Sequence, residues 1–197
     1  PNIAQILVLQ CSSQPNSFFI VSNTHLFWRP EFDCLRVLQT HRLRKRIEEI
    51  RGEDDEKLSG ALVIMCGDWN SDPKSAVYHL ISGQIDQITR SHWTNLVSSH
   101  STLLGFPPEY SQRLFAQVLE DFKKWPNLTS AYSQYQSPTD PEIRGEPPYT
   151  SINSYIDTLD YIFVDQKKML VSELLMLPPD EVVRGQTALP NQIYSSD

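Results

Sequence analysis

Residues 61–73 read ALVIMCGDWNSDP, an apolar run followed at once by glycine, acidic and amide side chains and a proline. The apolar part, Ala61–Cys66, is bounded by glycines, which predicts a short buried β-strand. Asp68 and Asn70 follow this strand directly. A charged group beside a buried strand costs free energy unless it is paired or binds a cation. The stretch therefore predicts a sheet with a polar site at the end of one strand.

Two more strands are expected upstream. Ile3–Leu9 and Phe18–Val21 are apolar, and the polar segment Ser12–Ser17 between them has the composition of a hairpin loop, so we predict two adjacent buried strands. His25 follows the second of them. The sequence thus places a second polar, chemically competent residue near the end of a strand.

A long helix is predicted from Asp33 to Arg51, because apolar residues recur there at spacings of three to five. This pattern assigns one face to the core. The opposite surface is expected to carry the basic residues of the segment, and the interleaved Glu48 and Glu49 favour a solvated face over a nucleic-acid patch. These basic residues are Arg42, Arg44, Lys45 and Arg46.

The remainder of the chain alternates helix and strand patterns around an irregular middle, residues 84–148. Helices are predicted at Ser75–Ile81 and Tyr110–Lys124, and strands at Thr158–Val164 and Leu170–Leu177. Strands interleaved with helices and long loops indicate an α/β (α+β) fold.

The composition bounds the class of protein. The chain has 197 residues, 17 Lys plus Arg against 24 Asp plus Glu, and a net charge of −7, which fits one domain with a hydrophobic core. No apolar run is long enough to span a membrane, and the negative charge argues against broad binding to duplex DNA. The three cysteines form no disulfide or zinc pattern, are expected to be small buried hydrophobes, and favour a reducing compartment. We expect an intracellular, most simply cytoplasmic protein, with mitochondrial or nuclear placement left open.

Polar groups abut predicted strands at His25, Asp68 with Asn70, Asp160 and Asp197. Carboxylate and amide oxygens are ligands of a hard cation such as Mg²⁺, whereas Zn²⁺ prefers more His or Cys. Such a site with a His is typical of phosphate-ester hydrolysis. Other readings fit the same residues: an Asx turn at Asp68 and Asn70, a structural role for His25, and a simple terminal position for Asp197.

The order and wording of the motifs resemble the endonuclease/exonuclease/phosphatase superfamily, and within it the carbon-catabolite-repressor-type exoribonucleases. The matching stretches are NTHLFWRP at 23–30, CGDWNSDP at 66–73, Tyr149–Thr150 leading to LDYIF at 159–163, and Ser196–Asp197. The resemblance implies a DNase I-like sandwich of two sheets flanked by helices. It also implies that residues 1–197 are the C-terminal part of a single domain truncated at both ends, with a metal-binding Glu before Pro1 and a closing His after Asp197.

The resemblance implies a role for each matching residue. His25 would contact the scissile phosphate, and Asp68 with Asn70 would orient the attacking water and hold phosphate and metal. Asp160 would support the catalytic His and the metal site, and Asp197 would join Asp68 and Asn70 as a metal ligand.

Two further positions match base-contacting residues of the RNA-cleaving members: Pro30 after the His motif and Tyr155 before the LDYIF motif. Stacking on an aromatic ring suits an enzyme that uses single strands. Alternatively, Tyr155 is an ordinary aromatic residue of a loop.

The expected activity of the full-length protein is a Mg²⁺-dependent phosphodiesterase (Mn²⁺ also fits) that removes adenylates from the 3′ end of RNA and releases AMP. Its substrate would be single-stranded RNA or oligoadenylate. The same site also fits 2′,5′-oligoadenylate, a 2′,3′-cyclic phosphate end or a nucleotide cofactor, and a non-catalytic binding module is a further alternative. Residues 1–197 alone are expected to be inactive.

Overall fold

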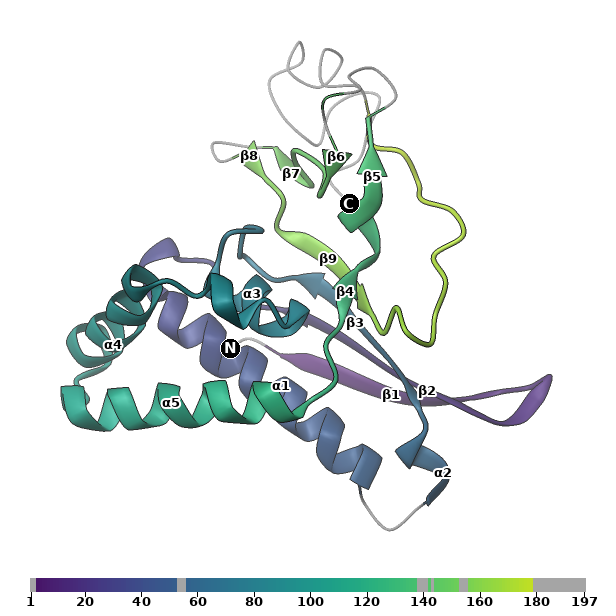
Figure 1. The fold of residues 1–197 in the computed structure, drawn as a ribbon, viewed down its shortest axis with the longest axis horizontal. Helices are drawn as coiled ribbons and strands as arrows, with labels where there is room; N and C mark the ends of the chain where they lie inside the picture. The colour runs from purple at the N-terminus through teal and green to yellow at the C-terminus, as the bar shows by residue number, and fades with distance from the viewer. Residues whose placement is uncertain (1–2, 53–55, 138–141, 143, 153–155, 179–197) are drawn as a thin grey trace.

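A five-stranded mixed sheet forms the centre of the structure, a computed structural model that describes residues 3–52, 56–137, 142, 144–152 and 156–178 (Figure 1). The strands, in their spatial order, are β1 (Ala4–Cys11), β2 (Gln14–His25), β3 (Leu62–Asp68), β9 (Asp160–Val164) and β4 (Thr129–Ser130). Strands β2 and β3 are parallel, and the other neighbours are antiparallel. A parallel pair needs a crossover connection, which the chain makes between β2 and β3.

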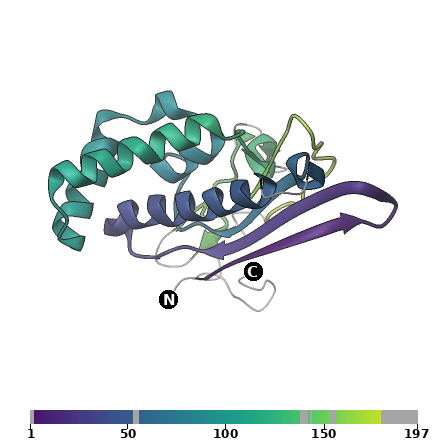
Figure 2. The same ribbon diagram turned by 90° about the horizontal axis from the view of Figure 1, so that it is seen from below.

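The longer helices lie on one side of this sheet, as Figure 2 shows. They are α1 (Asp33–Gly52), α3 (Ala76–Ser82), α4 (Arg90–Leu104) and α5 (Pro108–Lys124). Short elements complete the described part of the chain: α2 (Glu56–Ser59), the 3₁₀ turns η1 (Pro30–Phe32), η2 (Ile85–Gln87) and η3 (Ala131–Gln134), and the ribbons β5 (Tyr135–Gln136) with β6 (Arg144–Gly145) and β7 (Ser151–Ile152) with β8 (Ile156–Asp157). The predicted α/β (α+β) class is confirmed. Of the two sheets expected in the sandwich, the described residues form this one large sheet.

The core lies between the sheet and the helices. Every second side chain of the central strands is buried there, among them Ile20 in β2, Met65 in β3 and Phe163 in β9. They meet buried residues such as Val37 of α1 and Val118 of α5. Strand side chains alternate between faces, so the residues between these buried positions face away from the helices.

The prediction that the first two strands are both buried is wrong for β1. This strand is the edge of the sheet, and Leu7 is 58% exposed on it. The hairpin is also tighter than predicted, because β1 ends at Cys11 and β2 begins at Gln14. An apolar run reports the tendency to form a strand, but the position of that strand in the sheet depends on pairing with distant residues.

The predicted range of helix α1 is confirmed, but the side chain of Arg44 does not lie on the solvent-exposed face of the helix. The side chain is buried, forms an ion pair with Glu48 (Nη2 to Oε1, 2.8 Å) and donates to the carbonyl oxygen of Pro126 at 2.8 Å. Burial lowers the pKa of Arg44 to about 10, against the opposing charge of Glu48. The long side chain thus links α1 to the segment after α5, a contact that helical periodicity cannot reveal.

Helix α4 was not predicted. Its start signal is the capping box of Thr89 and His92, and its end signal is Gly105 in the left-handed conformation (φ 75°). Serines and threonines occupy much of its exposed surface and mask the apolar positions. The spacing of Trp93, Leu96 and His100 was the signal that could have found it.

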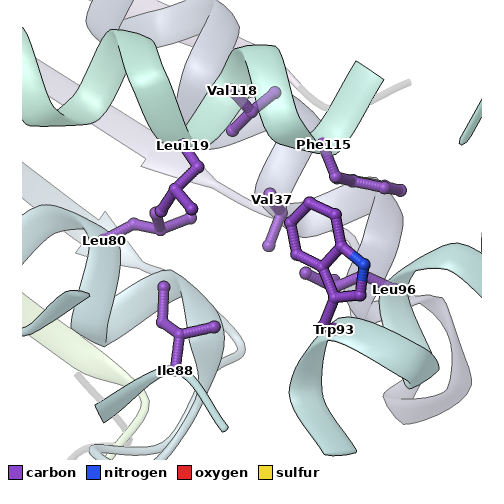
Figure 3. A pocket seen from close by; sticks show the side chains of 8 residues that line it. All are labelled: Val37, Leu80, Ile88, Trp93, Leu96, Phe115, Val118 and Leu119. Atoms are coloured by element: carbon purple, nitrogen blue, oxygen red, sulfur yellow. The ribbon is translucent and has the colours of Figure 1, made fainter. Parts of the chain in front are cut away.

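The helices meet around a small apolar cavity of about 10 Å³, shown in Figure 3. This is about the space of one water molecule. Its lining residues are Val37, Leu80, Ile88, Trp93, Leu96, Phe115, Val118 and Leu119. The helical layer is therefore closely packed and offers no room for a ligand at this place.

The predicted strand at Leu170–Leu177 is wrong. These residues form no strand or helix, and Leu170 is 92% exposed. One anchor of the segment is the hydroxyl of Tyr132, which donates to the carbonyl oxygen of Leu175 at 3.0 Å. An apolar run becomes a strand only where a partner strand is available, and this one runs as irregular chain.

The cysteines form no disulfide, as predicted: Cys11, Cys34 and Cys66 are all free thiols. Only Cys34 is buried, so the expectation that all three are core hydrophobes is wrong for the other two. None of the helices in the described ranges is sufficiently long and apolar to cross a bilayer.

Glu146 links the segment after β6 to the body of the structure and provides a test of stability against pH. Its carboxylate accepts hydrogen bonds from the hydroxyls of Tyr78 (2.7 Å) and Ser130 (3.1 Å). Burial raises the pKa of Glu146, and these two hydrogen bonds offset only part of the effect. The folded state then binds the proton more tightly than the unfolded chain, so stability falls as the pH rises through the interval between the two pKa values.

We therefore expect Glu146→Gln to be more stable than the wild type at pH 8 and to lose most of this advantage at pH 4, where the carboxyl is largely protonated in both states. Urea unfolding of both proteins between these pH values measures the difference. A stability difference that is independent of pH would contradict the prediction.

Candidate active site

Three predicted site residues form a row across neighbouring strands. His25 of β2 is the register partner of Asp68 in β3, and Asp68 is the register partner of Asp160 in β9. Register partners share a face of the sheet. The preceding row, which contains Thr24 and Tyr161, is buried toward the helices. The row of His25, Asp68 and Asp160 consequently lies on the opposite face, which the helices leave uncovered.

Within this row, the side chains of His25 and Asp68 are in direct contact. His25 Nε2 lies 3.4 Å from Asp68 Oδ2, with the His side chain 68% and the Asp side chain 31% exposed. Directly opposed residues of antiparallel strands have Cβ atoms about 5 Å apart, so Asp160 brings a second carboxylate close to that of Asp68. Strand pairing thus gathers one imidazole and two carboxylates at the solvent-accessible ends of three adjacent strands.

Asn70 joins the row through the turn after β3. Its backbone N–H donates to Asp68 Oδ1 at 2.8 Å, which is the Asx turn that the sequence allowed. Its side-chain Nδ2 donates to the carbonyl oxygen of Leu26 at 2.9 Å and so ties the turn to the chain after His25. Asn70 has a φ of 47°, a conformation that Asn tolerates better than most residues. The Asx turn and a functional role are therefore compatible, because the turn holds the side chains of Asp68 and Asn70 in place.

Trp69 anchors this turn in the hydrophobic core. Its side chain is fully buried and meets Phe163 edge to face, with ring centroids 5.4 Å apart. Its backbone N–H donates to the carbonyl oxygen of Leu159 at 2.8 Å. The alternation of part-exposed Asp68, buried Trp69 and part-exposed Asn70 thus separates anchoring from chemistry within three consecutive residues.

Asp160 has a partner that sequence reasoning missed. The hydroxyl of Thr150 donates to Asp160 Oδ2 at 2.7 Å and accepts hydrogen bonds from the backbone N–H groups of Leu159 (3.0 Å) and Asp160 (2.9 Å). A carboxylate in a β-run needs a specific partner, and Thr150 supplies it. The Tyr149–Thr150 motif was the available signal, but no pattern in the sequence indicates which distant strand the hydroxyl reaches.

The remaining predicted site residues are not brought into this row by the described contacts. Pro30 is exposed at the start of η1, on the loop that follows His25. Tyr155 and Asp197 lie outside the described residues. The structure therefore assembles His25, Asp68, Asn70 and Asp160, with Pro30 on an adjacent loop.

Comparison with known proteins points to phosphodiesterases. The chain is 30% identical over 198 residues to the 2′,5′-phosphodiesterase 12 of Mus musculus, an alignment that covers all of this chain and 27% of that protein. It is 31% identical over 220 residues to the carbon catabolite repressor protein 4 homolog 1 of Arabidopsis thaliana, covering all of this chain and 33% of that protein. No protein-family model matches the chain.

A solved structure supports the fold. The structure of ANGEL2, a 2′,3′-cyclic phosphatase in complex with adenosine-2′,3′-vanadate, matches with a TM-score of 0.63 and 24% identity over all of this chain and 58% of that one. The chain spans about a third or less of the length of the curated relatives named above. The chain is therefore similar in sequence to 2′,5′-phosphodiesterase 12 and to CCR4-type exoribonucleases, which are hydrolases, and it shares the fold of the ANGEL2 structure.

Proposed function

We propose that the full-length protein is a Mg²⁺-dependent phosphodiesterase that removes adenylates from the 3′ end of single-stranded RNA and releases AMP. The observation that carries the proposal is the row of His25, Asp68 and Asp160 on the open face of the sheet, with Asn70 fixed beside it. This set of groups can bind a phosphate, orient a water molecule and place a cation. The homology to phosphodiesterases and exoribonucleases supports the same reaction class.

The donor chemistry of the row fits Mg²⁺. Asp68 and Asp160 would repel an anionic phosphate, so a bound substrate requires a cation between them. Carboxylate and amide oxygens are the ligands that Mg²⁺ prefers, and Asp68 with Asn70 would hold it. The described residues contain no group of three or more His, Cys, Asp or Glu side chains that could hold a metal ion by themselves, and the resemblance adds Asp197 from outside these residues.

Each residue of the site has a distinct task in this proposal. Asp68 and Asn70 would hold the Mg²⁺ ion, which would supply neutralisation of charge at the phosphoryl group. His25 donates a hydrogen bond to a non-bridging phosphate oxygen, and Asp68 orients the attacking water for in-line displacement. Asp160, held by Thr150, keeps the second carboxylate of the row in place.

Hydrolysis of 2′,5′-linked oligoadenylate is a second candidate, favoured by the 30% identity to 2′,5′-phosphodiesterase 12. The reacting groups would be the same, because both linkages present a phosphodiester between two adenosines. The two linkages differ only in which sugar oxygen, 2′ or 3′, is bonded to the phosphate.

The test is release of AMP by the full-length protein from 3′,5′-linked and 2′,5′-linked hexaadenylate, each with Mg²⁺ and with EDTA. We expect release from the 3′,5′-linked substrate that EDTA abolishes. Release from the 2′,5′-linked substrate alone would transfer the assignment to the second candidate. A folded protein that releases AMP from neither would refute both.

Thr150 provides a test of positioning within the site. Thr150→Val keeps the shape of the side chain but removes the donor to Asp160 Oδ2 and the acceptor for two backbone N–H groups. Because supporting hydrogen bonds typically matter 10- to 100-fold in such sites, we expect kcat to fall by about that factor with KM little changed. Thr150→Ser retains the hydroxyl and should restore most of kcat. Equal losses in both variants would contradict the role of the hydroxyl.

A further inference from the structure

Trp28 is an exposed aromatic residue on the loop that follows His25. Its side chain is 63% exposed, although Trp is among the residues that proteins bury to a large extent. It lies three positions after His25, so its Cα is at most about 11 Å from that of His25. A large aromatic surface is thus available within a short distance of the catalytic row.

Buried Arg36 of α1 holds this loop in one conformation. Its guanidinium donates to the carbonyl oxygens of Phe27 (3.4 Å), Arg29 (2.6 Å) and Pro30 (3.1 Å). A buried guanidinium is tolerated only where acceptors surround it, and here the loop carbonyls are those acceptors.

Two contacts of Phe27 add to this support. Its backbone N–H donates to Gln39 Oε1 at 3.1 Å, and its ring meets Phe32 edge to face with centroids 5.1 Å apart. The loop that carries Trp28 is therefore preorganised, and the exposure of the ring follows from the fixed backbone on either side of it.

Arg29 adds a positive charge to the same surface. Its guanidinium carbon lies 5.3 Å from the centroid of the Trp28 ring, within the range of a cation–π contact. An aromatic plane beside an exposed cation matches a nucleotide, which offers a flat base for stacking and a phosphate for charge pairing. Arg36 braces both residues through the Arg29 carbonyl.

We propose that Trp28 and Arg29 form a stacking site for a nucleobase of a single-stranded oligonucleotide, next to the nucleotide that occupies the catalytic row. The proposal rests on the proposed function, in which the nucleotide at the row of His25, Asp68 and Asp160 is the one at the 3′ end of the RNA. The site is separate from Pro30 and Tyr155, to which the resemblance assigns base contacts. The site contacts the flat face of a base. Because every base has such a face, the site tolerates different base sequences.

The test measures binding of 5′-fluorescein hexaadenylate and of 5′-fluorescein-labelled AMP, a single nucleotide, to the full-length protein, with Asp68→Asn in the background to prevent turnover. Trp28→Ala should weaken binding of hexaadenylate roughly tenfold and leave binding of AMP unchanged, because loss of one base stack has about this effect and AMP has no second base to stack. Trp28→Phe retains a ring and should recover most of the affinity. Tyr110→Ala, at an exposed aromatic residue of α5, is the matched control and should bind as the parent does.

A second arm identifies the base. Hexaadenylates with one abasic position each should show a single position whose loss weakens binding to the parent but has no further effect in Trp28→Ala. Equal affinity of Trp28→Ala and the parent for hexaadenylate, or no binding of the parent to any probe, would overturn the proposal. Binding that depends on Trp28 without AMP release would retain the stacking site and reject the proposed function, and AMP release with unchanged binding would do the reverse.

Discussion

Replacing Asp68 with alanine in the full-length protein should abolish phosphodiester hydrolysis while the protein stays folded, with a loss of about 10³-fold or more in kcat. Asp68 contacts His25 Nε2 at 3.4 Å and accepts the Asn70 backbone N–H at 2.8 Å, so its carboxylate touches both neighbours in the site. The substitution removes the group that, in the proposed reaction, orients the attacking water and holds the cation, whereas the strand pairing of β3 is made by the backbone.

The measurement is the rate of AMP release at saturating Mg²⁺, together with the thermal melting temperature. Asp86→Ala is the matched control, because Asp86 is an exposed acidic residue of η2 that belongs to no part of the site. Wild-type activity in Asp68→Ala would refute the assignment of Asp68, and equal losses in both variants would point to a general effect of charge.

Replacing Gly67 with alanine should destabilise the fold by about 3–5 kcal/mol, from backbone strain and overpacking together. Gly67 has a φ of 134°, which L-residues rarely adopt, and an added Cβ would lie 1.9 Å from the carbonyl oxygen of Thr24. The obstacle is the backbone of the neighbouring strand, so no side chain can move aside. Strands β2 and β3 would have to separate directly beside the pairing of His25 with Asp68.

Urea unfolding of Gly67→Ala against the wild type measures this effect. Gly60→Ala is the control, since no atom lies within 4 Å of a Cβ added at Gly60 and we expect a change within about 0.5 kcal/mol. If Gly67→Ala matched Gly60→Ala in stability, the close approach of the two strands could not be as tight as the structure has it. A soluble but inactive Gly67→Ala would place the damage at the site itself.

Local patterns were sufficient for the elements whose signals lie within a few residues. Helices α1, α3 and α5 and strand β3 follow from apolar spacing and from caps such as Ser75 and Gly83 at the ends of α3. Helix α4 escaped because its serine-rich surface hides the apolar spacing. The run Leu170–Leu177 misled because strand propensity does not supply a partner.

The candidate site shows the same division. The residue types at His25, Asp68, Asn70 and Asp160 are evident from the sequence, because polar groups beside apolar strands are costly without a function or a partner. Their assembly is not evident. Asp68 and Asp160 meet only because β9 pairs with β3 across more than ninety positions of sequence. Such pairing depends on which strand edge the folded core leaves available.

The amino-acid sequence by itself determined the α/β class, helices α1, α3 and α5 and the residue types of the site, since each of these depends on periodicity or chemistry within short segments. Only the tertiary structure decided that β1 is an exposed edge, that Arg44 and Arg36 are buried, that Thr150 holds Asp160, and that Trp28 is exposed on a loop held by Arg36. These features depend on contacts between different elements of the fold. Their free energy comes from strand register, burial and hydrogen bonding in the assembled fold, which no local pattern contains.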